Sequence, residues 1–201
     1  MENSIYRSIA ALEHIARNTL ISFDPSLLYG SPSAVNIEKL ATQLGLCIEF
    51  QCIRKTGVIL GEMVYEDTLV PLYLRDIKAY DLVPIEGMTI ILDESLLRCK
   101  TDGRLRFTCA HEIAHWLLHQ TYYAGTGQAA AFGNPKYSSE ENPAVEWQAN
   151  KLGSMLLLPK TQVKRAFYPI QGRSNSLMTL KDRFDVSIDV MEIFMREHNL
   201  K

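Results

Sequence analysis

The sequence predicts an α+β fold in which several helices pack against one small sheet. Apolar residues recur at helical spacing near both ends of the chain, whereas residues 46–92 contain short β-branched and aromatic runs separated by turn residues. The connections between these runs are short, so the sheet should be mixed or mostly antiparallel. Because no repeat, low-complexity segment or clear linker divides the 201 residues, we expect a single domain.

The N-terminal part should begin with two helices. Residues 4–21 carry apolar side chains every three or four positions, which is typical of a packed surface helix. The stretch 23–33 is rich in turn-forming Pro, Ser and Gly. Asn36 can then cap a second helix, which Gly45 ends. Four strands are expected next, at residues 46–53, 58–65, 69–74 and 88–92.

The rest of the chain should be mainly helical. A short helix is expected from residue 93 or 94 to 99, and a longer one at about 104–120. Residues 122–142 fit neither a helix nor a strand, and a loop of this length in a compact domain usually serves a function. Asn142-Pro143 supplies a cap and a first-turn proline for a helix that ends near residue 157. Three more helices are expected, at 160–168, 176–184 and 187–198.

The composition argues against several classes of function. The chain has 21 Lys and Arg against 23 Asp and Glu, a net charge of −2, so no basic field favours direct binding of nucleic acid. No long apolar run follows the N-terminus, so we expect neither a signal peptide nor a membrane span. The four cysteines form no CxxC pair and lie in apolar surroundings, which is typical of reduced thiols in a cytoplasmic protein.

The expected helix at 104–120 carries His111-Glu112-Ile113-Ala114-His115. Residues four apart on a helix lie about 40° apart around its axis and about 6 Å apart along it, so both imidazoles can reach one ion. Glu112 lies roughly 60–100° around the axis from both. Catalytic zinc takes neutral imidazoles and keeps an open position for water, and a nearby carboxylate accepts that water's proton. The pattern therefore predicts one catalytic Zn²⁺ ion, with Glu112 as acid/base.

Two histidines hold zinc poorly, so the site needs a third protein ligand. Glu146 is the best candidate, because it lies one turn into the next helix on the same face as Ala149, Asn150 and Gly153. The two small residues would let the helices approach closely. Asn150 could accept a hydrogen bond from a ligand imidazole and fix its tautomer. The glutamates at 140–141 lie in the preceding loop and are weaker candidates.

Other residues near the motif have different expected roles. Cys109 lies about 200° around the helix from His111, so we expect it in the core. His119 lies on the metal-bearing face but about 12 Å along the axis from His111, too far to share the ion. It could line the cleft or support the site. Peptide hydrolysis usually needs a hydrogen-bond donor for the oxyanion, and His119, Tyr122 and Tyr123 are candidates by proximity.

Longer stretches around these residues extend the pattern. They are Arg106-Phe-Thr-Cys-Ala-His-Glu-Ile-Ala-His with Leu-Leu-His119 following, Glu146-Trp-Gln-Ala-Asn, Met155-Leu-Leu-Leu-Pro159 and Leu180-Lys-Asp-Arg-Phe-Asp-Val-Ser187. With these stretches the chain resembles the ImmA/IrrE family of zinc metallo-endopeptidases. The resemblance covers most of the chain from about residue 36.

The resemblance implies a compact zincin-like (gluzincin) core, with a small, mostly antiparallel sheet packed on helices and a helical C-terminal part. It implies His111, His115 and Glu146 as ligands of one zinc ion and Glu112 as the catalytic acid/base. The implied substrate is a separate protein, a helix-turn-helix repressor encoded nearby, whose cleavage would release stress or mobile-element genes. Trp116 and Trp147, which lie beside the two motifs, depart modestly from the family pattern, as does the long loop at 121–141.

The whole chain, 1–201, would then be one metallopeptidase domain. Its expected parts are an N-terminal helix and loop at 1–35, a catalytic core at 36–160 and C-terminal helices at 161–201.

Three other interpretations remain. A DNA-binding regulator could act through 177–200, which has helix-turn-helix spacing, although Asp189, Glu192 and Glu197 would repel phosphates. A non-catalytic zinc-binding protein could sense a signal or bind a partner through the same cleft. A different metallohydrolase, such as a deformylase, would need a cysteine ligand in a suitable loop. Neither the cysteine at 99 nor the one at 109 is well placed to be that ligand.

Overall fold

A computed structural model describes residues 6–56, 58–98, 103–123 and 143–200. The α-helices are α1 (Ile9–Phe23), α2 (Ser26–Tyr29), α3 (Ile37–Gln43), α4 (Arg104–Tyr123), α5 (Pro143–Leu157), α6 (Lys160–Phe167), α7 (Ser176–Phe184) and α8 (Ile188–Glu197). The 3₁₀ turns are η1 (Glu94–Arg98) and η3 (Tyr168–Ile170). The strands are β1 (Cys47–Gln51), β2 (Gly61–Val64), β3 (Thr68–Leu74), β4 (Ala79–Ile85) and β5 (Thr89–Asp93). The predicted α+β class is confirmed.

The described strands form two small sheets where the sequence predicted one. In the first, of order β1-β5-β2, β5 pairs parallel with β1 and antiparallel with β2. In the second, β3 and β4 form an antiparallel hairpin. Strand β4 was not predicted, because four of its seven residues are exposed in succession and no alternating apolar pattern marks it. The pairings are nevertheless mostly antiparallel, as expected.

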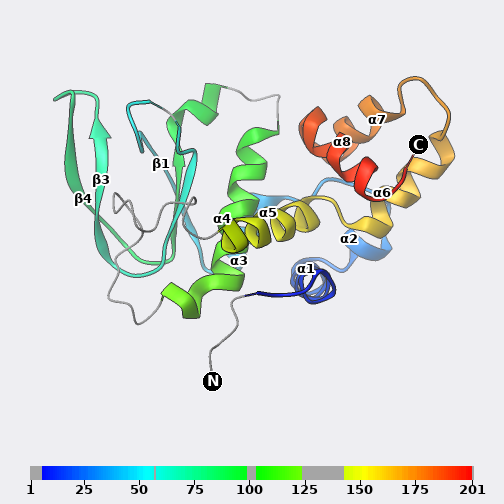
Figure 1. Cartoon of the computed structure of the whole chain (residues 1–201), viewed down its shortest axis with the longest axis horizontal. Coiled ribbons are helices and arrows are strands. Elements are labelled where there is room, and N and C mark those ends of the chain that lie inside the picture. The colour runs from blue at the N-terminus through cyan, green and yellow to red at the C-terminus, as the bar shows by residue number, and fades with distance from the viewer. Residues whose placement is uncertain (1–5, 57, 99–102, 124–142, 201) are drawn as a thin grey trace.

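Strand β5 divides the molecule into layers because all five of its residues are buried. Ile90 and Leu92 belong to the larger core beneath the helices. Ile91 points to the other face and joins a second core with residues of the β3–β4 hairpin such as Val70 and Leu72. The three-stranded sheet therefore lies between the hairpin on one side and the helices on the other (Figure 1).

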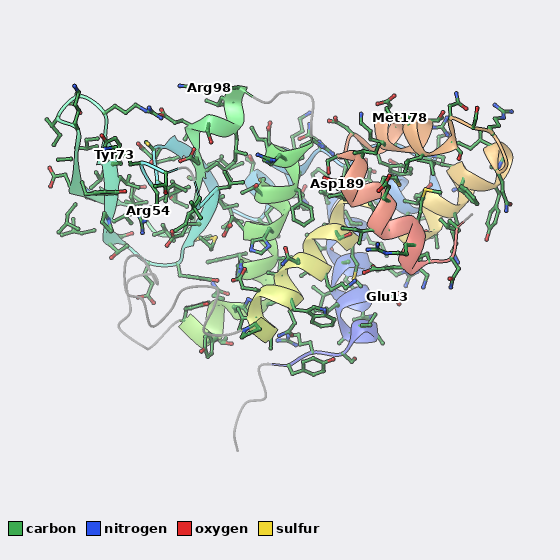
Figure 2. All side chains as sticks on the ribbon, turned by 45° about the horizontal axis from the view of Figure 1, so that its top comes forward. Glu13, Arg54, Tyr73, Arg98, Met178 and Asp189 are labelled. Carbon is green, nitrogen blue, oxygen red and sulfur yellow. The ribbon has the colours of Figure 1, made fainter. Side chains whose placement is uncertain are left out.

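The hairpin is tied to the rest of the chain through residues that precede β2. Arg54 donates from Nη1 to the carbonyl oxygens of Ile53 and Pro71, at 2.9 and 3.0 Å. The backbone N–H of Tyr73 donates to the carbonyl oxygen of Cys52, at 2.9 Å. Figure 2 shows Arg54 and Tyr73 in this outer part of the molecule, away from α4 and α5.

Helix α4 packs against β2 and β5 of the three-stranded sheet and crosses α5 (Figure 1). Cys109 is fully buried in α4, as expected of a core residue. The crossing is close: a β-carbon placed on Gly153 of α5 would lie 3.1 Å from the backbone nitrogen of His111 and 3.2 Å from the carbonyl carbon of Ala110. A glycine at this position therefore lets the two backbones approach, which is the role predicted for the small residues of α5.

The two ends of the chain pack around these helices. Helix α1 lies against α5 and starts at residue 9, later than predicted, because Ser8 caps it by accepting from the N–H of Ala11. The turn-rich stretch at 23–33 contains the short helix α2. Asn36 caps α3 as predicted, and Ser187 caps α8. The predicted cap at residue 142 lies outside the described residues.

No helix in the part of the chain that the structure describes is both long and apolar enough to cross a membrane. Three cysteines in that part, Cys47, Cys52 and Cys109, are free thiols, and Cys47 is exposed. Cys99 lies outside it.

Candidate metal centre

The crossing of α4 and α5 brings His111, His115 and Glu146 together. The Nε2 atoms of the two histidines are 2.9 Å apart. Glu146 Oε2 lies 3.3 Å from His111 Nε2, and Glu146 Oε1 lies 3.2 Å from His115 Nε2. These residues form a group whose possible ligand atoms all lie within 4.8 Å of one another.

The geometry of this group fits a small tetrahedral cation. Ligand atoms about 2.0–2.1 Å from a tetrahedral zinc ion lie about 3.3–3.4 Å from one another, close to the three separations here. Burial alone would raise the pKa of Glu146, but hydrogen bonds and charge from His111 and His115 hold it well below its usual range, so the carboxylate is ionised. Two imidazoles with one ionised carboxylate form a donor set found in catalytic zinc sites.

The orientation of the His111 ring comes from α5. His111 Nδ1 lies 3.1 Å from Asn150 Oδ1, so Nδ1–H donates to the amide oxygen and Nε2 is the ring nitrogen left to bind a metal ion. Burial lowers the pKa of His111, but the hydrogen bond to Glu146 and the charges of Glu112 and Glu146 outweigh it and raise the pKa overall. The local field therefore favours positive charge at the point where the three ligand atoms meet.

Glu112 lies next to this point and packs against the sheet. It is buried, and a β-carbon on Gly61 of β2 would lie only 2.7 Å from Glu112 Oε1. A glycine at this position of β2 thus makes room for the carboxylate. Burial raises the pKa of Glu112, the charges of His111 and His115 lower it, and Glu146 raises it again, with a net increase. A carboxyl group whose pKa is raised towards neutrality is suited to both accepting and returning a proton.

A family model described as the IrrE N-terminal-like domain of peptidases matches residues 78–196, more than half of the 201 residues. The chain belongs to this family. The match includes all of α4 and α5 and confirms the resemblance to ImmA/IrrE metallopeptidases. Family membership implies peptidase activity, and the His-His-Glu group is arranged so that it could hold a metal ion. No curated protein matches the chain.

His119 contacts His115 on the side of that ring away from Nε2, the atom that faces the other ligands. Its Nδ1 is 3.1 Å from His115 Nδ1, and the side chain is buried. Burial, and then the charge of His115, lowers the pKa of His119 to about 3, so its ring is neutral. Neutral His119 can therefore accept at Nδ1 and orient His115, while its Nε2 has no hydrogen-bond partner among the described residues. This position does not suit the expected role of lining a cleft.

Aromatic side chains form a wall beside the centre. Tyr65, which directly follows β2, stacks on Trp116 with ring centroids 6.0 Å apart and on Tyr123 at 5.0 Å. Tyr122 meets Tyr123 edge to face at 5.0 Å and is 36% exposed. Burial, followed by the charge of Glu146, raises the pKa of Tyr123 to about 12. Tyr65 was missed by the sequence analysis, because a tyrosine at the end of a strand carries no local signal for a site 46 positions further on.

Residues 124–142 of the predicted loop, which include the glutamates at 140–141, lie outside the described residues.

Proposed function

We propose that the chain is a zinc-dependent endopeptidase that cleaves a helix-turn-helix transcriptional repressor. The convergence of His111, His115 and Glu146 beside the buried Glu112 is the observation that carries the proposal. The repressor as substrate rests on the resemblance to the ImmA/IrrE family. The expected cytoplasmic location would place the enzyme in the same compartment as such a repressor.

Zinc held by His111, His115 and Glu146 would polarise the scissile carbonyl and lower the pKa of water in the site towards about 7. Glu112 accepts a proton from water as the water oxygen bonds to the carbonyl carbon, and the carbonyl π electrons move to the carbonyl oxygen. When the C–N bond breaks, the oxygen returns those electrons to re-form the carbonyl, and Glu112 gives its proton to the leaving nitrogen. Water and peptide thus become one carboxylic acid and one amine.

The position of strand β2 is an argument that the substrate is a polypeptide. It lies at the edge of the three-stranded sheet, so its second edge pairs with no strand among the described residues. Gly61 of this strand contacts Glu112. An extended peptide that added alongside β2 would therefore run past the catalytic carboxylate, with its backbone held by hydrogen bonds.

The alternative of DNA binding through 177–200 is disfavoured. The N-terminal end of the second helix normally reads bases in a helix-turn-helix. Here Arg106 of α4 donates to the carbonyl oxygen of Asp185, at 2.8 Å, which fixes the turn before α8 against α4. Asp189, Glu192 and Glu197 are exposed on α8, and Asp189 lies near its start (Figure 2). Phosphates would be repelled from this surface.

Co-expression with the repressor encoded nearby tests the proposal. The wild-type chain should cut the repressor, and chelation of the metal in the purified enzyme should stop the reaction. Glu112→Gln should bind zinc with unchanged stoichiometry but cut at least about 10²-fold more slowly, the usual contribution of general acid–base catalysis. Glu146→Ala should lose zinc affinity, measured by chelator competition. Cleavage by Glu112→Gln at the wild-type rate would refute the mechanism, and an intact repressor beside the wild-type, zinc-loaded enzyme would refute the substrate.

A further inference from the structure

Hydrolysis of a peptide places negative charge on the carbonyl oxygen, and a fixed hydrogen-bond donor near that oxygen lowers the barrier. Two of the three donors suggested by sequence proximity, His119 and Tyr122, fit this role poorly. His119 is buried behind His115. Tyr122 is 36% exposed, at the end of the aromatic wall, and contacts Tyr123 edge to face. The structure brings another hydroxyl, that of Tyr65, to the same region.

Tyr65 is held in place from two sides. The chain enters it from β2, whose Gly61 packs against Glu112. The Tyr65 ring stacks on Trp116, the residue after His115, at an interplanar angle of 21°, and on Tyr123 at 25°. Two nearly parallel ring contacts with α4 fix the phenol relative to the helix that carries both histidines.

The Tyr65 hydroxyl is buried and has no hydrogen-bond partner among the described residues. Buried hydroxyls are normally paired, and leaving one unpaired costs on the order of 1–3 kcal/mol. Its surroundings belong to the metal centre: burial first, and then the charges of Tyr123, Glu112 and Glu146, raise the pKa of Tyr65 well above its usual value. The phenol therefore keeps its proton at neutral pH and remains a donor.

We infer that the Tyr65 hydroxyl is the donor that stabilises the oxyanion of the tetrahedral intermediate. This inference rests on the proposed endopeptidase function. The Tyr65 O–H makes no hydrogen bond with the described residues, its ring is held rigidly, and Glu112 and Glu146 of the centre lie near it. A substrate carbonyl oxygen that reaches the centre would therefore accept the hydrogen bond that the Tyr65 hydroxyl lacks. The bond strengthens as the oxygen becomes negative, so it favours the transition state over the bound substrate. Tyr65 donates a hydrogen bond only and transfers no proton.

Tyr65→Phe isolates the hydroxyl, because the ring and its stacking contacts remain. With a peptide that spans the repressor's cleavage site, kcat should fall about 10²- to 10³-fold, the usual loss for one oxyanion donor, and KM should change by less than about twofold. The zinc content should equal that of the wild type. Since the change removes an unpaired buried hydroxyl, Tm should stay the same or rise.

Binding gives a readout that does not depend on turnover. A phosphinic peptide, whose tetrahedral anion resembles the intermediate, should bind Tyr65→Phe more weakly by a factor similar to the loss in kcat, as measured by calorimetry. The cleaved peptide product should bind both enzymes equally. Tyr73→Phe, which Figure 2 shows on the β3–β4 hairpin away from α4, serves as the matched control and should keep kcat within about threefold of the wild type. Tyr123→Phe, in the same wall as Tyr65, tests the competing donor.

Wild-type kcat in Tyr65→Phe would overturn the inference while leaving the proposed function intact. So would a loss of zinc or of Tm that accounts for the fall in activity, because Tyr65 would then be structural. A larger loss of kcat in Tyr123→Phe than in Tyr65→Phe would assign the oxyanion to Tyr123 instead. A wild-type enzyme that does not cleave the peptide, or a Glu112→Gln enzyme that does, would overturn the proposed function and with it the role of Tyr65.

Discussion

Asn150 determines which nitrogen of His111 can face a metal ion. Its Oδ1 lies 3.1 Å from His111 Nδ1, and an amide oxygen can only accept, so the proton is on Nδ1 and the lone pair on Nε2. His119 does the same for His115, because a ring with a pKa of about 3 stays neutral and can accept at Nδ1. Both ligand imidazoles therefore have their tautomers fixed by a neighbouring side chain.

Replacing Asn150 should weaken metal binding without unfolding the protein. Asn150→Ala removes the acceptor, and we expect a loss of zinc affinity of about 10-fold, the lower end of the usual range, because Asn150 is exposed and water can partly take its place. Competition with a coloured chelator measures the affinity. Asn150→Asp keeps an acceptor at the same position and should retain near-wild-type binding. Equal losses in both variants would show that the hydrogen bond to His111 is not what Asn150 contributes.

The centre depends on how closely α4 and α5 cross. Glu146 and Asn150 both come from α5, whereas the two histidines come from α4, so a small shift between the helices changes every distance in the group. Gly153 permits the short distance between the two helices, since a β-carbon there would lie 3.1 Å from the backbone nitrogen of His111 in α4. Asn150 and the third ligand, Glu146, are therefore both positioned by one close contact between backbones.

Gly153→Val should push the helices apart. We expect a loss of stability of about 1–3 kcal/mol, as for other overpacked sites, together with weaker zinc binding because Glu146 and Asn150 move away from the histidines. Urea denaturation of the metal-free protein and chelator competition measure the two effects. Ser154→Val, on a half-buried position of the same helix, has the same β-branched side chain and should leave zinc affinity unchanged. Weakened binding in both would point to loss of helix propensity instead of the crossing.

The sequence predicted those parts of the site whose geometry follows from residue spacing alone. His111 and His115 lie one turn apart in any helix, so their convergence was predictable. The prediction of Glu146 as the third ligand depended on a second helix crossing the first, and the small residues of α5 indicated that crossing. Strand β4 could not be predicted, because it is exposed and has no apolar alternation. Tyr65 meets α4 only through long-range packing of β2, for which a single sequence contains no periodic signal.

The described α-helices and the three-stranded sheet share one large core. It contains Leu12 of α1, Leu92 of β5, Ile113 of α4 and Phe194 of α8. We propose on this basis that the N-terminal helix, the catalytic part and the C-terminal helices fold as one unit. The sequence suggested the same organisation from its lack of a linker, but it could not indicate which contacts join the parts, because those contacts connect residues far apart in the chain.

Arg106 provides a test of this proposal. It donates from Nη2 to the carbonyl oxygen of Val35, at 2.7 Å, and from Nε to the carbonyl oxygen of Asp185, at 2.8 Å. One half-buried guanidinium thus joins the segment before α3 and the turn before α8 to the helix that carries the histidines. Hydrogen bonds from a charged group contribute about 1.5–3 kcal/mol each, so their loss should be large for the whole fold.

Arg106→Gln should lower the free energy of unfolding by roughly 2–4 kcal/mol while leaving a single cooperative transition, since all parts lose the same anchor. Urea titration followed by far-UV circular dichroism and by tryptophan fluorescence measures this, because Trp116 and Trp147 report on α4 and α5. Arg183→Gln, on the exposed surface of α7, changes the charge equally and should shift stability by less than about 0.5 kcal/mol. If the circular dichroism of Arg106→Gln changed in two steps, with fluorescence following only the later one, the C-terminal helices would unfold separately and the single unit would be wrong.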